Sequence, residues 1–211
     1  MSRVILLKLI DRYGRRYPEE ADVIASFEDF VRSHENCFER SLTVGHVTGS
    51  AWIVDQPHKH CLLTHHRKLD RWLQLGGHAD GDDDIARVAT REAYEESGLE
   101  ALQLVSSEIF DLDVHLIPER GNEPAHYHYD VRYLFECAGD PALTVSEESN
   151  ELAWAALSAI ETYTSEDSIL RMVRKTGYPA SRLTFRHKDD RQPDDPRRSV
   201  EIRASQIYIG A

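Results

Sequence analysis

The most informative stretch of the sequence reads Gly76-Gly-His-Ala-Asp-Gly-Asp-Asp-Asp-Ile-Ala-Arg-Val-Ala-Thr-Arg-Glu-Ala-Tyr-Glu-Glu-Ser-Gly-Leu99. Its second half predicts a helix on which Glu92, Glu95 and Glu96 occupy positions i, i+3 and i+4, and therefore share one face. Like charges so arranged destabilise a helix, whereas grouped oxygen ligands suit a hard divalent cation, Mg²⁺ or Mn²⁺. Most isolated clusters of this kind are only solvated faces, so the cluster alone leaves both readings open.

The first half of this stretch is rich in glycine and predicts a loop whose backbone carbonyls can turn toward a cation. The spacing of the whole stretch resembles the Nudix box, Gly-x5-Glu-x7-Arg-Glu-U-x-Glu-Glu-x-Gly-U, where U is a bulky apolar residue. Asp83 replaces the first Glu of the pattern, and Ala93 is smaller than the usual U residue. Neither departure removes a carboxylate from the helix face. The positions that match in register are Gly77, Arg91, Glu92, Glu95, Glu96, Gly98 and Leu99.

This resemblance implies the α/β class, with a Nudix-like α/β/α sandwich around a mixed β-sheet. It also implies a Mg²⁺-dependent pyrophosphohydrolase, in which water attacks phosphorus in a nucleoside diphosphate linked to another group, X. The alternative is a catalytically silent Nudix-fold module that binds or senses a nucleotide. The three acids argue against this alternative, because a pure binder need not keep them. An isomerase of the same fold would need a Cys and Glu pair, and no cysteine lies near the box. The sequence does not identify X.

The resemblance also assigns roles to residues of the box. Glu95 and Glu96 are expected to be metal ligands, with the carbonyl of Gly77 as a third. Glu92 is expected to be a further ligand or the general base that takes a proton from water. The structural residues of the box are expected to be Arg91 and Asp83, with Arg91 holding Asp83 or the loop.

Nudix enzymes often take one more carboxylate from a later loop. Glu147 and Glu148 precede an expected strand, and Glu148 is the preferred metal ligand of the two. Their other interpretation is that they are solvated loop acids.

A second polar pattern occurs in Glu123-Pro-Ala-His-Tyr-His-Tyr-Asp130. On a strand, His126, His128 and Asp130 would share one face. Such a row could hold a second metal ion, contact substrate phosphate or form a hydrogen-bonded polar row. We predict substrate binding by His126 and His128 of this row, and by His78, which directly follows Gly77 of the box. His115 would join them if its β-run formed a hairpin with this one.

The remaining pattern predicts strands interleaved with helices, and three regions. These are a helical N-terminal extension over residues 1–40, a catalytic domain over 41–178, and a charged, partly mobile tail over 179–211. The tail is expected to end in an edge strand, Ser199 to Ile209, that could pair across a homodimer. The expected β-runs are Thr43 to Val54, Cys61 to His65, Leu102 to Ile117, Tyr127 to Cys137 and Leu152 to Ala156, and the expected late helices are Ser158 to Tyr163 and Ser165 to Lys175.

Composition limits the partners. The chain has 211 residues and a formal net charge of −12, which disfavours non-specific nucleic-acid binding. No stretch approaches the ~20 apolar residues of a membrane span. The three cysteines have neither metal-ligand nor redox spacing, and we expect reduced thiols and a cytoplasmic location. A cation would let this acidic protein bind a small nucleotide-like diphosphate.

Overall fold

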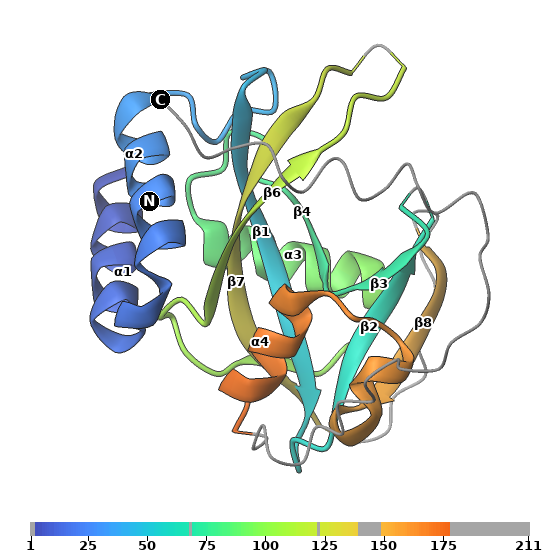
Figure 1. The fold of residues 1–211 in the computed structure, drawn as a ribbon. Helices are drawn as coiled ribbons and strands as arrows, with labels where there is room; N and C mark the ends of the chain where they lie inside the picture. Colours follow the sequence, from blue (N-terminus) through green and yellow to red (C-terminus); the bar gives the residue numbers. More distant parts are fainter. Residues whose placement is uncertain (1–2, 68, 122, 139–148, 178–211) are drawn as a thin grey trace, which may run out of the picture.

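The computed structural model describes residues 3–67, 69–121, 123–138 and 149–177 (Figure 1). Glu147, Glu148, the tail and its expected strand lie outside the described residues. No helix within those ranges is both long and apolar enough to cross a membrane.

The first two helices pack against each other at one edge of the sheet (Figure 1). They are α1 (Arg3–Arg16) and α2 (Ala21–Ser33), joined by the 3-10 turn η1 (Pro18–Glu20). Pro18 suits the first position of a helical turn because its missing N–H needs no partner there. The apolar faces of α1 and α2 enter the same core as the sheet, through residues such as Ile10, Phe27 and Val31. The helical extension is therefore packed onto the sheet.

The centre of the molecule is an eight-stranded mixed sheet. Its main path runs β3-β2-β1-β7-β5, while β4 pairs with β1, β6 with β7 and β8 with β2. The long pairing of β1 with β7 is parallel, and the other pairings are antiparallel. The strands are β1 (Gly45–Asp55), β2 (His60–His66), β3 (Arg71–Leu73), β4 (Leu75–His78), β5 (Leu102–Leu104), β6 (Asp111–Ile117), β7 (His126–Cys137) and β8 (Ser149–Ala156).

Helices cover both faces of the sheet, which confirms the predicted sandwich. In Figure 1, α3 (Ile85–Ser97) lies behind β1 and α4 (Asp167–Lys175) lies in front of it. Gly49 of β1 permits close packing of α3, because a Cβ there would come within 2.9 Å of Val88. A second apolar core lies on the other face, where Trp52 and Val54 of β1 meet α4 and the 3-10 turn η2 (Leu157–Thr162).

The ends of α3 follow from local sequence. The side chain of Asp84 caps the N-terminus by accepting a 3.3 Å hydrogen bond from the backbone N–H of Arg87. Gly98 ends the helix with φ of +67°, and its N–H donates to the carbonyl of Tyr94. Glycine adopts this left-handed conformation without the steric cost that a Cβ would bring.

Two expectations about the β-elements were wrong. We expected the glycine-rich loop to include Gly76 and Gly77, but both belong to β4 and pair with β1. Glycine in a strand allows another backbone to approach closely, and this is its role here. The single expected run from Leu102 to Ile117 is divided into β5 and β6, which pair separately with β7. Its middle, Ser106-Ser-Glu108, turns instead, and Ser106 Oγ accepts from the N–H of Glu108.

Candidate functional site

The glycine pair of the motif lies on β4, between β1 and the helix that carries the carboxylates. Gly76 pairs with Ser50, and Gly77 pairs with Gly49. A Cβ on Gly76 would collide with Ser50, and one on Gly77 would lie 2.6 Å from the carboxylate carbon of Glu92. Only glycine lets β4 run this close to both neighbours. The backbone of β4 is thereby exposed directly to the carboxylates of α3.

Two of the three carboxylates contact this backbone region. Glu92 is half-buried, and its Oε1 accepts a 2.7 Å hydrogen bond from Arg91. Glu96 is 8% exposed, and its Oε2 accepts a 3.2 Å hydrogen bond from the N–H of Gly76. Glu95 is exposed to solvent.

Arg91 ties α3 to the end of β4. Besides Glu92, its Nη2 donates a 3.0 Å hydrogen bond to the carbonyl of His78. The hydrogen bond to Glu92 is the largest of the influences that raise the pKa of the guanidinium. Asp83 is half-buried in the turn that precedes the helix cap. Arg91 thus has the geometry of a positioning residue.

The donors near β4 fit a hard cation. They are carboxylates and backbone carbonyls, which are the ligands that Mg²⁺ accepts. The ligand atoms of Glu92, Glu95 and Glu96 do not all come within 4.8 Å of one another among the described residues. Mg²⁺ tolerates this spread, because it usually keeps several of its waters and does not need a closed cage of protein ligands.

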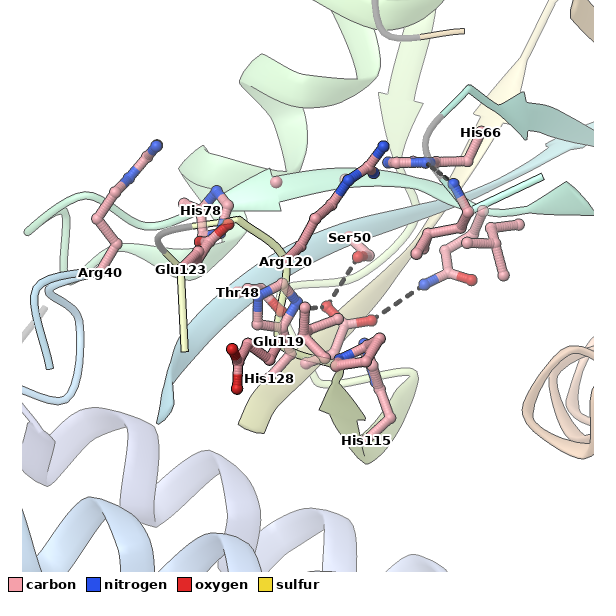
Figure 2. Close-up of a pocket in the computed structure, with 18 residues that line it drawn as sticks. Arg40, Thr48, Ser50, His66, His78, His115, Glu119, Arg120, Glu123 and His128 are labelled. Atoms are coloured by element: carbon pink, nitrogen blue, oxygen red, sulfur yellow. Dashed lines mark hydrogen bonds between the residues drawn. The ribbon is translucent and has the colours of Figure 1, made fainter. Parts of the chain in front are cut away.

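A pocket of about 450 Å³ opens beside β4 (Figure 2). Its floor is formed by β1, β4 and β7, and the loop after β6 covers one side. Arg40 and Arg120 place two cationic side chains in its wall. Arg40 also forms an ion pair with Asp80, which lowers the pKa of that carboxyl group. The other lining residues are Thr48, Ser50, His66, Leu69, Leu73, Gln74, Gly76, Gly77, His78, His115, Ile117, Pro118, Glu119, Glu123, His128 and Asp130.

Histidines gather along one wall of this pocket. His78 and His128 line it, and the buried His46 lies behind them with ring centroids 4.9 Å from each. His126 is also buried, 5.0 Å from His46, and His115 stands 5.4 Å from His128. The structure therefore brings together the three histidines that the sequence singled out and the neighbouring His115.

Burial keeps the inner histidines neutral. It lowers the pKa of His46 to about 4 and that of His128 to about 2, and neighbouring histidines add to both shifts. The pKa of His78 is lowered as well, by burial first and then by the charge of Arg40. The backbone carbonyl of Leu42 opposes part of the lowering of the His46 pKa, but it does not have the geometry of a hydrogen bond to either ring nitrogen. Neutral imidazoles carry lone pairs that can bind a metal ion or accept a proton.

Below the histidines, Asp130 organises the pocket floor. Its carboxylate accepts hydrogen bonds from Thr48 at 2.9 Å, Ser50 at 2.7 Å and Gln74 at 3.0 Å (Figure 2). Arg132 adds a fourth, at 2.7 Å. The expected polar row of His126, His128 and Asp130 is thus present on one face of β7, with its acidic member fully hydrogen-bonded.

Arg132 connects Asp130 to a buried charge network. It also contacts Asp111 at 3.1 Å and Asp113 at 3.2 Å. Burial opposes ionisation of both carboxyl groups, but the cations outweigh it and the pKa of each is lowered, with Arg171 foremost for Asp111 and Arg132 for Asp113. Arg171 of α4 reaches Asp111 at 2.8 Å and Asp113 at 3.1 Å. The network joins the pocket floor to α4.

A family model described as the NUDIX domain matches residues 45–175. This span contains the motif, the sheet and both covering helices. The chain belongs to the Nudix family. The predictions of a Nudix-type fold and of a Nudix-type hydrolase are therefore confirmed at the level of the family.

Several solved structures are similar to this chain. An Ap4A hydrolase from C. elegans is 17% identical, covers 62% of this chain and 94% of its own, and has a TM-score of 0.49. A NUDIX-family hydrolase from Clostridium perfringens is 21% identical over 63% and 96%, with the same TM-score of 0.49. The dihydroneopterin triphosphate pyrophosphohydrolase of E. coli is 15% identical over 61% and 92%, also at 0.49. A search of curated protein sequences found no match.

The Nudix box itself was found from sequence, but several pocket residues were not. His46, Arg40 and Arg120 lie outside every motif that the sequence analysis used. The alternation His46-Val-Thr48-Gly-Ser50 in an expected strand was the available signal, because it places three polar side chains on one face. Three aromatic residues near the site lie in packed positions: Trp72 against Tyr163, Tyr129 against Phe30, and Phe110 in the second core.

Proposed function

We propose that this Nudix protein is a Mg²⁺-dependent pyrophosphohydrolase that cleaves a diphosphate linkage in a small nucleoside diphosphate-X molecule. The observation that carries the proposal is the position of β4. Its side-chain-free backbone lies against Glu92 and Glu96 of α3, and the same strand forms the floor of the pocket. A diphosphate bound across the glycine pair, which borders both the pocket and Glu92, would reach the carboxylates from the pocket.

The proposed metal ligands are Glu95, Glu96, the carbonyl of Gly77 and Glu92, with Glu148 as an outer ligand. When bound, Mg²⁺ would neutralise charge on the diphosphate and orient the attacking water. Glu92 is the proposed general base, because a carboxylate oxygen can take the proton of water as the bond to phosphorus forms. The hydrogen bond from Arg91 would hold the carboxylate of Glu92 in position for this proton transfer.

The proposed substrate contacts come from the pocket wall. Arg40 and Arg120 would attract a phosphate group, and guanidinium groups match phosphate geometry well. His78 and His128 face the same space, with His126 behind them. A pocket of about 450 Å³ suits one small nucleotide-like ligand. The net charge of −12 also favours such a ligand, taken up with a cation, over an extended polyanion.

The proposal is tested with purified full-length protein, Mg²⁺ or Mn²⁺, and a panel of nucleotide sugars, dinucleotides, nucleoside triphosphates and CDP-alcohols. We expect release of a nucleoside monophosphate from at least one substrate class. Glu95→Gln and Glu96→Gln should each abolish this turnover. Glu100→Gln is the matched control, because Glu100 is exposed just beyond α3 and should leave the rate unchanged.

A different outcome would identify the alternative. If no member of the panel is cleaved, while nucleotides raise the melting temperature without metal, the protein is a binding or regulatory module.

A further inference from the structure

We propose that His46, His78 and His128 form a binding site for a zinc-class divalent metal ion, separate from the carboxylates of the Nudix box. One ligand atom from each of these histidines lies within 4.8 Å of the other two. In the part of the chain that the structure describes, this is the only group of three His, Cys, Asp or Glu residues with such spacing. The inference goes beyond the proposed hydrolase function and does not depend on it.

The site is assembled by strand register. His46 of β1 is directly opposite His128 of β7 in their parallel ladder, and His78 of β4 pairs with Thr48, two residues from His46. Residues two apart on a strand share a face. The three rings therefore project from three neighbouring strands onto the same side of the sheet, with centroids 4.9 to 5.1 Å apart.

The inner rings have unused polar atoms. His46 is only 2% exposed, and both of its ring nitrogens are buried without a hydrogen-bond partner. Nε2 of His128 and Nε2 of His126 are likewise buried and unpartnered. Buried polar atoms are nearly always hydrogen-bonded, because an unpaired one loses its interactions with water and gains none. A metal ion at the centre of the cluster would supply a partner for one of these nitrogens on each ligating ring.

The chemistry of these donors favours a metal ion over an anion. The buried ring nitrogens of His46 and His128 that lack a hydrogen-bond partner can offer lone pairs, which a cation can use and an anion cannot. Imidazole nitrogen suits Zn²⁺, Cu²⁺, Ni²⁺ and Fe²⁺, whereas Mg²⁺ prefers oxygen. In a tetrahedral zinc site with Zn–N distances of about 2.0–2.1 Å, ligand nitrogens stand about 3.4 Å apart. The rings would therefore close inward by at most about 1.4 Å.

Neighbouring groups support the cluster from outside. Nδ1 of His126 is 2.8 Å from the carbonyl of Pro124, so Nδ1 carries the proton and the unpartnered Nε2 is the basic atom. On the opposite side, Nδ1 of His115 lies 3.0 Å from Asp113. Hydrogen bonds of this type orient rings around protein-bound metals. His126, 5.0 Å from His46, is the candidate for a further ligand.

The proposed ion would face the pocket and not the Nudix helix. Successive residues of a strand point to opposite faces, so Gly77 meets Glu92 on the α3 side while His78 points to the pocket side. Three protein ligands leave one position of a tetrahedral ion open, as in catalytic zinc sites. His78 and His128 line the pocket, so a substrate would meet them through this ion.

The test measures metal binding without substrate. Full-length protein is stripped with a chelator, dialysed and titrated with Zn²⁺ by calorimetry in excess Mg²⁺, and Co²⁺ is added separately to record its visible absorption. We expect one Zn²⁺ per chain and the intense absorption of tetrahedral Co²⁺. His46→Gln and His78→Gln should each weaken Zn²⁺ binding by at least about a hundredfold, more than loss of an outer-shell partner typically does.

Matched controls assign the ion to this cluster. His58→Gln removes a histidine beyond the other end of β1, and Glu95→Gln removes a carboxylate of the box; both should retain Zn²⁺ binding. If His46→Gln fails to fold, His78→Gln decides, because His78 is only half-buried. The proposal is overturned if the wild type binds no Zn²⁺, if His78→Gln binds it normally, or if Glu95→Gln abolishes binding. A chain that binds Zn²⁺ but cleaves no diphosphate would refute only the proposed hydrolase function.

Discussion

Asp130 accepts a 2.7 Å hydrogen bond from Nε of Arg132, two residues along the same strand, and each of the two side chains is 2% exposed. The same carboxylate accepts hydrogen bonds from Thr48, Ser50 and Gln74. It therefore connects β7 to β1 and to the residue between β3 and β4. A buried carboxylate with this many donors is stable only while its cation remains in place. Arg132 is therefore expected to govern the integrity of the pocket floor.

Replacing Arg132 by methionine tests this. Arg132→Met keeps much of the side-chain volume but leaves Asp130 without its cation and weakens the hold on Asp111 and Asp113. Removing one partner of a buried pair typically costs about 3–5 kcal/mol, so the free energy of unfolding should fall by that amount. Urea denaturation followed by circular dichroism gives the free energy of unfolding.

In the control, Arg71→Met breaks the exposed pair with Glu166 and should lower the free energy of unfolding by less than about 1 kcal/mol. An equal loss in both variants would contradict the argument.

The helix that carries the carboxylates was predictable because its signals are local. A capping Asp84, the i, i+3 and i+4 spacing of the glutamates and the terminating Gly98 are all contained in one short segment. The histidine cluster was only half predictable. Alternation on one strand placed His126 and His128 together, but His46 reaches them through the parallel pairing of β1 with β7, whose strands are far apart in the sequence.

The strand β4 escaped prediction for a related reason. Glycine is unfavourable in an isolated strand, so Gly76 and Gly77 indicate a loop when only the sequence is considered. They form a strand because Ser50 and Glu92 approach from both sides, leaving no room for a side chain. Tertiary packing here outweighs local preference, and sequence alone contains no record of that packing.

The close approach at Gly77 leads to a prediction about activity. In Gly77→Ala, the new Cβ would lie 2.6 Å from the carboxylate carbon of Glu92 and would displace that side chain. Misplacing a catalytic group by about 1 Å can lower the rate about a hundredfold, and we expect kcat to fall by that order.

Gly14→Ala is the control, because its Cβ would meet nothing nearer than 3.5 Å. That variant should keep full activity and gain about 0.5–1 kcal/mol of stability, since Gly14 lies within α1. Full activity in Gly77→Ala would show that Glu92 need not stay where it is.

The cysteines should be unreactive in the folded protein. Cys37, Cys61 and Cys137 are all buried and free, and burial raises the pKa of each thiol, to about 11 for Cys37. The thiolate is the reactive form, so labelling by a disulfide reagent at neutral pH should be slow. All three thiols should react promptly after denaturation, which serves as the control. Rapid labelling of the native protein would show that at least one of these cysteines becomes exposed.

The neutral histidines predict that the metal-free protein loses stability in mild acid. The unfolded chain takes up protons at histidine near pH 6.5, whereas burial lowers the pKa of His46 to about 4 and that of His128 to about 2 in the folded state. Because the unfolded state binds more protons below about pH 6.5, the free energy of unfolding should fall as the pH drops toward about 4. Each such histidine contributes a slope of up to about 1.4 kcal/mol per pH unit.

Urea denaturation in chelator at about pH 7.5, 6 and 5 measures this slope above the range in which Asp111 and Asp113 titrate. His46→Gln removes one group that cannot protonate when folded, so its slope should be shallower by up to about 1.4 kcal/mol per pH unit. His60→Gln is the control. His60 begins β2, beside Asp55 at the end of β1 that is far from His46, and it is partly exposed. The argument fails if His46→Gln and the wild type lose stability in parallel. A flat profile in the wild type would instead mean that the buried rings protonate while the protein stays folded.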